Sequence, residues 1–197
     1  MNVAIEAKEK DTRQRIVETA ERLFRQLGYQ KTTVADIARE LGMSPANVYR
    51  FFGAKSEINE AVARQLMSEV EHAAEAVVAG PGTAAERLRA LLHTINKMNG
   101  ERYVDDRKLH EMVAVALSES WPIVQEHIAH MGGILAKLIS EGVASGEFAA
   151  CDVALTANLV HKATIRYCHP RLMVECADEP TPSLDEMVDF CLKALIK

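Results

Sequence analysis

The chain has 197 residues, of which 48% are hydrophobic and 26% are charged, and its formal net charge is −5. This is an ordinary soluble globular balance that allows one large or two small domains. The charged first residues exclude a signal peptide, and no apolar run approaches the ~18 residues that a membrane span needs.

The N-terminal segment is charged, so residues 1–10 are predicted to be disordered, with Lys8 and Lys10 available for DNA phosphates. A helix capped by Asp11 or Thr12 is predicted to run to Leu27. Its apolar stripe consists of Ile16, Ala20, Leu23, Phe24 and Leu27.

The charges are unevenly distributed along the chain. Residues 1–60 carry 10 basic and 9 acidic side chains, and the rest of the chain carries 13 and 19, so the acidic excess lies outside the N-terminal part. That distribution permits DNA binding by the N-terminal part.

The next stretch has the pattern of two short helices joined by a tight turn. The residues that recur at helical spacing in the first helix are Val34, Ile37, Ala38 and Leu41. Thr33 is placed to cap this helix, and Gly42 follows it where a left-handed residue commonly ends a helix. Ser44 and Pro45 then begin a second helix, predicted to end near Phe52. The pair predicts a helix-turn-helix unit, with a third cap at Ser56.

The second helix of this pair has a polar outer face. Val48 and Phe52 are four residues apart and are predicted to pack back on the first helix. The residues left facing outward are Ala46, Asn47, Tyr49 and Arg50. Asparagine can bond an adenine edge, arginine a guanine edge and tyrosine a phosphate. A plain helical hairpin is the alternative, but the caps, the glycine turn and the outward donors together favour DNA binding.

Residues 32–58, TTVADIARELGMSPANVYRFFGAKSEI, resemble the TetR family of bacterial transcription regulators. The positions that carry the resemblance are Thr33, Gly42, Ala46, Tyr49, Phe51, Phe52 and Lys55. Arg50 and Phe51 depart from the Tyr or His of many members, so operator preference cannot be taken from a relative. The predicted DNA contacts are base readout by Asn47 and Arg50, close approach at Ala46, and phosphate contacts by Thr33, Ser44, Tyr49 and Lys55.

The resemblance implies an all-α fold with a DNA-binding domain over residues 1–55 and a helical effector-binding and dimerisation domain over residues 56–197. Apolar periodicity predicts six helices in the second domain, for nine in all and no strand. Their ranges are 56–79, 83–100, 103–117, 120–142, 152–168 and 183–196. Capping boxes begin two of them, at Thr83 and Ser183. The unbroken helix from residue 56 is predicted to join the two domains rigidly.

Two further features of the second domain are a glycine pair and a proline-rich stretch. Gly132-Gly133 lies inside a predicted helix and indicates either close packing of a neighbouring helix or a hinge. The stretch 169–182 contains three prolines and is predicted to be an irregular loop.

No catalytic motif is found: there is no phosphate loop, nucleophile elbow or HExxH, so we expect neither an enzyme nor a cofactor. The four cysteines lack a CxxC pair, which argues against zinc and disulfides and indicates a reducing cytoplasm. Cys151, Cys168 and Cys191 are interpreted first as buried structural residues. His127 and His130 are weak evidence for a metal site. A sensor of metal or oxidant that uses the Cys and His residues remains the alternative to a sensor of small molecules.

The resemblance implies a homodimer that binds double-stranded operator DNA and releases it when an effector binds. The dimer is predicted to form through the last two helices, with Val160, Tyr167, Leu184, Val188, Leu192 and Leu195. The effector is predicted to be a mostly apolar small molecule, since methionine surfaces adapt to ligands of variable shape. Its predicted contacts are Met98, Tyr103, Met112, Trp121, His127, Met131 and Asn158.

Overall fold

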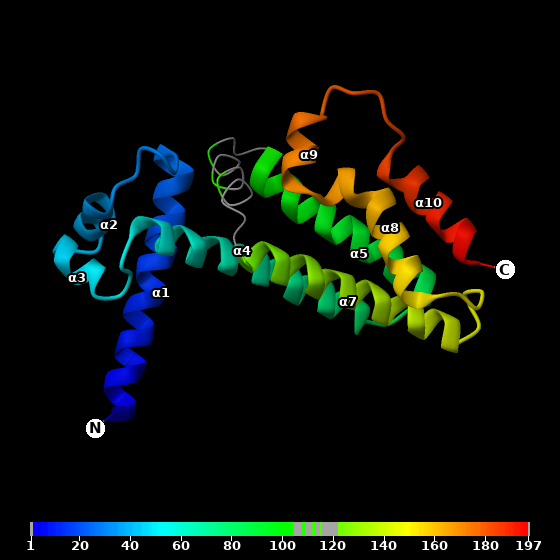
Figure 1. Ribbon diagram of the computed structural model, residues 1–197, viewed down its shortest axis with the longest axis horizontal. Coiled ribbons are helices and arrows are strands. Elements are labelled where there is room, and N and C mark those ends of the chain that lie inside the picture. The colour runs from blue at the N-terminus through cyan, green and yellow to red at the C-terminus, as the bar shows by residue number, and fades with distance from the viewer. Residues whose placement is uncertain (1, 105–107, 109–111, 113–114, 116–121, 197) are drawn as a thin grey trace. The chain divides into compact units, whose positions relative to one another are not determined.

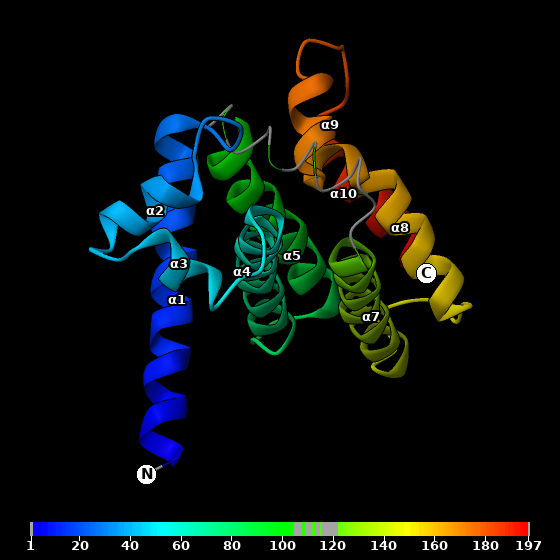
Figure 2. The same cartoon turned by 60° about the vertical axis from the view of Figure 1, so that its left-hand side comes forward.

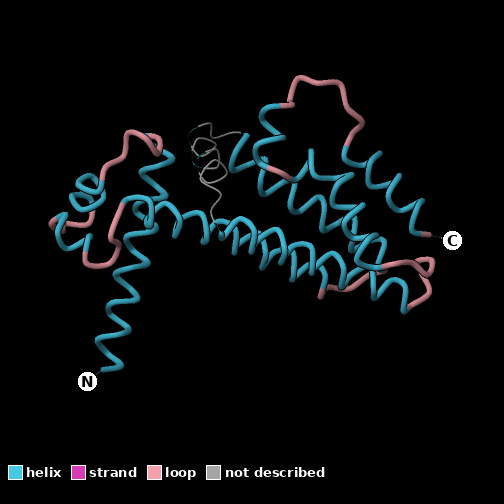
Figure 3. The backbone as a smooth tube through the Cα atoms, viewed as in Figure 1, coloured by secondary structure: helices cyan, strands magenta, loops and turns pink. Residues whose placement is uncertain are grey.

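The computed structural model of the protein describes residues 2–104, 108, 112, 115 and 122–196. These residues form nine α-helices and one π-helical segment, and no strand is found among them (Figure 3). The predicted all-α fold is therefore confirmed. Most of the predicted helix 103–117, the predicted start of the helix after it and Trp121 lie outside the described residues.

The chain divides into two compact units, residues 1–66 with 106–123 and residues 67–105 with 124–197. Helix α4 (Lys55–Val78) supplies residues to both of them. The predicted domain boundary between residues 55 and 56 stays a prediction. Among the described helices, none is long and apolar enough to cross a membrane.

The first unit is built on α1 (Asn2–Leu27), against which α2 (Val34–Glu40) packs, while α3 (Pro45–Tyr49) packs against α2 (Figure 1). These helices, the turn after α3 and the start of α4 contribute buried apolar side chains, which include Ile16, Ala20, Phe24, Ile37, Val48, Phe52, Ile58 and Val62. The predicted inward position of Leu27 is wrong, because this side chain is 44% exposed at the end of α1.

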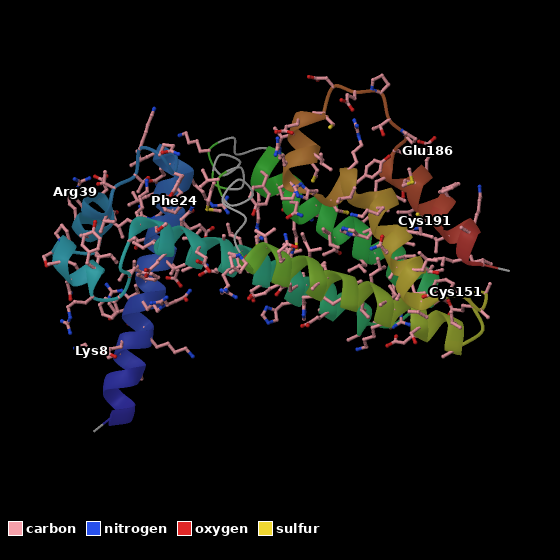
Figure 4. All side chains as sticks on the ribbon, in the orientation of Figure 1. Lys8, Phe24, Arg39, Cys151, Glu186 and Cys191 are labelled. Carbon is pink, nitrogen blue, oxygen red and sulfur yellow. The ribbon has the colours of Figure 1, made fainter. Side chains whose placement is uncertain are left out.

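The prediction of disorder over residues 1–10 is also wrong, since α1 begins at Asn2. Lys8 lies on this N-terminal part of the helix (Figure 4). Thr12 does not cap the helix, because its hydroxyl donates to the carbonyl of Lys8 at 2.9 Å within it. Ser56 likewise lies inside α4 rather than before it. The apolar stripe located the core-facing part of α1, but it gave no signal for the turns that precede it.

The second unit is built around one core of buried side chains, to which the second half of α4 and four further helices contribute. Figure 2 shows these helices as ribbons. These are α5 (Ala84–Asn99), α7 (Pro122–Ala144), α8 (Val153–Cys168) and α10 (Leu184–Leu195). The predicted capping boxes at Thr83 and Ser183 are both present, with Glu86 and Glu186 as the reciprocal partners. Local sequence signals therefore placed the starts of α5 and α10 correctly.

Two segments of this unit differ from the predictions. α5 continues into a π-helix, η1 (Gly100–Val104), so Gly100 does not end the helical path. The predicted loop contains α9 (Pro170–Glu175), which packs against η1. Pro170 is at the first helical position, and the His169 ring accepts the Arg171 N–H at 3.2 Å. A proline at this position begins a helix rather than breaking it, because its missing N–H would have had no partner.

Gly132 and Gly133 lie within an unbroken α7. A Cβ atom added at either position would meet no described atom within 4 Å, so close packing does not require these glycines. On the same helix, His127 and His130 pair with Glu71 and Glu75 of α4 at 2.7 and 2.9 Å. These pairs join α7 to the second half of α4, on the N-terminal side of the two glycines.

Candidate nucleic-acid interface

Helix α2 is fixed at its start by a reciprocal cap. The Thr33 hydroxyl accepts the Asp36 N–H at 3.1 Å, and the Asp36 carboxylate accepts the Thr33 N–H at 2.9 Å. Hydrogen bonds from Thr33 and then from Arg39 lower the pKa of Asp36, so this carboxylate is ionised at neutral pH. The predicted Thr33 cap is confirmed, whereas the role of Asp36 was not predicted, because a capping box usually has Glu or Gln at that position.

The turn between α2 and α3 depends on Gly42, whose φ of 65° is in the left-handed region. The next N–H, that of Met43, returns to the Ala38 carbonyl at 2.8 Å. Ser44 then caps α3 by accepting the Asn47 N–H at 3.2 Å, and Pro45 occupies the first helical position. The predicted roles of Gly42 as the turn residue, Ser44 as the cap and Pro45 as the first helical residue are confirmed.

α3 contains five residues and ends at Tyr49, three residues earlier than predicted. The N–H groups of Phe51 and Phe52 still bond the Val48 carbonyl, at 2.9 and 3.2 Å, so the chain completes one more irregular turn. The side chains of Val48 and Phe52 are 0% and 1% exposed, as predicted. They fix which face of α3 turns toward the core.

The opposite face of α3 is exposed. Tyr49 is 51% exposed, Ala46 and Arg50 are exposed, and Asn47 is half-buried. A tyrosine this exposed contributes little to the core of its own chain, while its hydroxyl and ring are free to contact a partner. This face therefore carries the hydrogen-bonding groups that suit base edges and phosphates in a DNA groove.

Two cations make contacts between residues far apart in the sequence near the turn that follows α3. From α4, the Lys55 ammonium donates to the Tyr29 carbonyl and lies 4.1 Å from the centroid of the Tyr29 ring. Burial lowers the pKa of Lys55. From α1, Arg13 donates to the Phe51 carbonyl at 2.6 Å. The phosphate contact of Lys55 stays a prediction. The contact of Arg13 was not predicted, because no spacing rule relates residues so far apart.

The predicted effector contacts that the structure describes are divided between the two units. Met112 is buried in the first unit, whereas Met98, Tyr103, His127, Met131 and Asn158 belong to the second. Asn158 is exposed on the face of α8 that also carries Leu155 and Leu159, so it points away from the core. The His127 ring is held by Glu71 at 2.7 Å. Met131 packs against the core of the second unit.

Most of the predicted dimer residues pack or form hydrogen bonds within their own chain. Val160, Val188, Leu192 and Leu195 are at most 8% exposed and belong to the core of the second unit, while Tyr167 donates to the Pro182 carbonyl at 2.7 Å. The large apolar side chains that α8 and α10 leave exposed are Leu155, Leu159 and Phe190, at 57%, 59% and 64%. Helical periodicity identified the inner face of α10, and this face packs within the chain.

The cysteines give little support to a redox or metal sensor. Burial raises the pKa of the Cys168 thiol to about 12 and also raises that of Cys191, so both stay protonated and unreactive at neutral pH. Cys151 is exposed, which corrects its interpretation as a buried residue. Across the described residues, no three His, Cys, Asp or Glu side chains are placed to share a metal ion.

The capped helix pair with a buried inner face and a polar outer face is a helix-turn-helix DNA-binding unit. Residues 16–62 match the family "Bacterial regulatory proteins, tetR family", and residues 84–188 match "Tetracyclin repressor-like, C-terminal domain". The chain belongs to the TetR family and is a transcriptional regulator.

Individual relatives agree with this assignment. The uncharacterized HTH-type transcriptional regulator YhgD of Bacillus subtilis is 28% identical over 163 residues, which are 79% of this chain and 81% of that protein. The regulator BetI of Brucella anthropi is 34% identical over 80 residues, 41% of each chain. A TetR/AcrR-family regulator of Thermobifida fusca has a TM-score of 0.63 at 26% identity, covering 93% of this chain and 95% of its own. A TetR-family regulator of Pectobacterium atrosepticum has the same fold, with a TM-score of 0.72 at 20% identity over 95% and 92% of the two chains.

Proposed function

We propose that the protein is a ligand-responsive repressor that binds a palindromic operator as a homodimer and leaves it when a small, mostly apolar molecule binds. The observation that carries this proposal is the exposed face of α3, with Tyr49 51% exposed above the buried Val48. A protein with this role acts in the cytoplasm, where the bacterial chromosome lies. Asn47 and Arg50 are the proposed base contacts, and Thr33, Ser44, Tyr49 and Lys55 the proposed phosphate contacts.

The proposed dimer surface is the exposed apolar face of α8 and α10. Leu155 and Leu159 are one helical turn apart on α8, and Phe190 lies on α10, which packs against α8. Large apolar side chains that are each more than half exposed, on two helices that pack together, support a surface that a second protein copy covers. A two-fold dimer buries the same patch on both copies, so each residue contributes twice.

The effector is proposed to bind in the second unit. Structural relatives with the same fold were solved with choline, in a putative regulator from Saccharomonospora viridis, and with resorcinol, in RolR. Their TM-scores to this chain are 0.68 and 0.63, at 21% and 16% identity. Choline is a cation without a ring, whereas resorcinol is a neutral aromatic compound. The chemical class of the effector of this chain is therefore inferred from the chain's own side chains. Met98 and Met131, both partly buried, remain the proposed apolar contacts.

The test is a mobility-shift titration with the DNA upstream of the protein's own gene, followed by screening of cell-extract fractions for release. Asn47→Ala should weaken specific binding by about 1–3 kcal/mol and relax preference at one base pair. Gln125→Ala, at an exposed position on α7, serves as the control and should leave binding unchanged. Equal binding of wild type to operator and scrambled DNA would refute the proposal.

A further inference from the structure

Arg13 joins the middle of α1 to the chain that leaves α3. Its guanidinium donates to the Phe51 carbonyl at 2.6 Å, across 38 residues of sequence. The same guanidinium carbon lies 4.0 Å from the centroid of the Phe52 ring. A planar guanidinium can stack on an aromatic face and donate in its own plane at once, so the two contacts are compatible.

Both contacts act on the C-terminal end of α3. The last carbonyl groups of a helix lack a donor within the helix, and the Phe51 carbonyl belongs to the turn that closes this end. Phe52 is 1% exposed, so its ring is a fixed surface of the core. Arg13 therefore joins the carbonyl of a turn residue to an aromatic ring that is buried in the core.

The exposed face of α3 needs such a connection because the helix is short. With five residues it is far below the length at which a helix is stable alone, so its orientation depends on tertiary contacts. Ser44 fixes its first turn and Val48 fixes its inner side. At the other end, Arg13 of α1 contacts Phe51 in the exit turn of α3, residues 50–54. Lys55, the first residue of α4, contacts Tyr29 and so fixes the point where this turn ends.

We infer that Arg13 is a positioning residue for operator recognition, which sets the orientation of Tyr49 and Arg50 through the exit turn of α3. The inference rests on the proposed binding of operator DNA. A base contact is lost when its geometry changes slightly, whereas attraction to phosphates depends mainly on charge. Loss of Arg13 therefore weakens specific binding and leaves non-specific binding nearly unchanged.

The experiment compares Arg13→Ala with the control Arg15→Ala, since Arg15 is also an exposed arginine on α1 and its removal changes the charge equally. We expect Arg13→Ala to lose about tenfold in operator affinity, which corresponds to about 1.4 kcal/mol. Its affinity for scrambled DNA and its salt dependence should match those of Arg15→Ala. A fall of about 0.9 in the salt slope for Arg13→Ala alone would instead identify a phosphate contact and overturn the inference.

Hydrogen exchange provides a readout that needs no DNA. The N–H groups of Phe51 and Phe52 bond the Val48 carbonyl, and they should exchange several-fold faster in Arg13→Ala while remaining unchanged in Arg15→Ala. Unchanged exchange in Arg13→Ala would overturn the inference even if operator binding were confirmed. If the wild type binds no operator, the proposed function fails, and accelerated exchange would still establish that Arg13 fixes α3.

Discussion

Phe190→Glu should convert the proposed dimer into a monomer without unfolding the chain. Complete burial of a phenylalanine side chain is worth about 1.5–3 kcal/mol, so covering the 64% of Phe190 that is exposed contributes about 1–2 kcal/mol per protomer. The residue occurs twice in a two-fold dimer, so its loss costs about 2–4 kcal/mol. The dissociation constant of the dimer should then rise roughly 30- to 700-fold, and the new carboxylate adds a desolvation cost.

The monomer should tolerate this change because Phe190 contributes little to its core. Leu192→Glu, two residues later, places a carboxylate in a position that is 8% exposed and belongs to the core of the second unit. That variant should unfold rather than dissociate. The two substitutions therefore separate the exposed face of α10 from its buried face.

Sedimentation velocity over a range of micromolar concentrations measures the association, and thermal unfolding followed by circular dichroism measures the stability. Ile128→Glu is the matched control, because Ile128 is a large apolar side chain that is 42% exposed on α7, outside the proposed dimer face. It should sediment like the wild type. A Phe190→Glu variant that stays dimeric at low micromolar concentration would refute the interface, and so would a control that dissociates equally.

Three further predictions concern single structural features. Replacing both Gly132 and Gly133 by alanine should raise the free energy of unfolding by about 1 kcal/mol per site, because alanine favours a helix and no described atom lies within 4 Å of the added Cβ. Urea unfolding measures this change, and a lower stability of the variant would show that the added methyl groups meet other atoms. Asn59 is 0% exposed, and among the described residues neither its Nδ2 nor its Oδ1 has a hydrogen-bond partner. Because an unpaired buried amide costs free energy, Asn59→Leu should stabilise the first unit by about 1–3 kcal/mol in the same urea assay. A destabilised variant would indicate a buried water on Asn59. Because burial raises the pKa of the Cys168 thiol from 9.0 to about 12, the unfolded thiol ionises first, and stability should fall as pH rises through this range. Iodoacetamide at pH 8 should therefore alkylate the exposed Cys151 and spare Cys168, and mass spectrometry showing equal labelling would refute the assignment.

The sequence by itself determined the helix-turn-helix unit. Thr33, Gly42, Ser44 and Pro45 each act within about four residues, through a cap, a left-handed turn or a free first N–H, and the structure has each of them as predicted. Capping boxes likewise identified the starts of α5 and α10. Signals of this kind are local, so they can be interpreted without the rest of the fold.

Only the tertiary structure decided which apolar faces remain exposed. Periodicity predicts that one face of α10 is apolar, but it does not say whether the same chain or a second copy covers it. The structure buries Val188 and Leu192 within the chain and leaves Phe190 exposed. The contact of Arg13 with Phe51 could not be predicted for the same reason: it joins residues 38 positions apart, and no local rule relates them. Contacts of this range are set by how the helices pack, and packing depends on the complete set of side chains in the core.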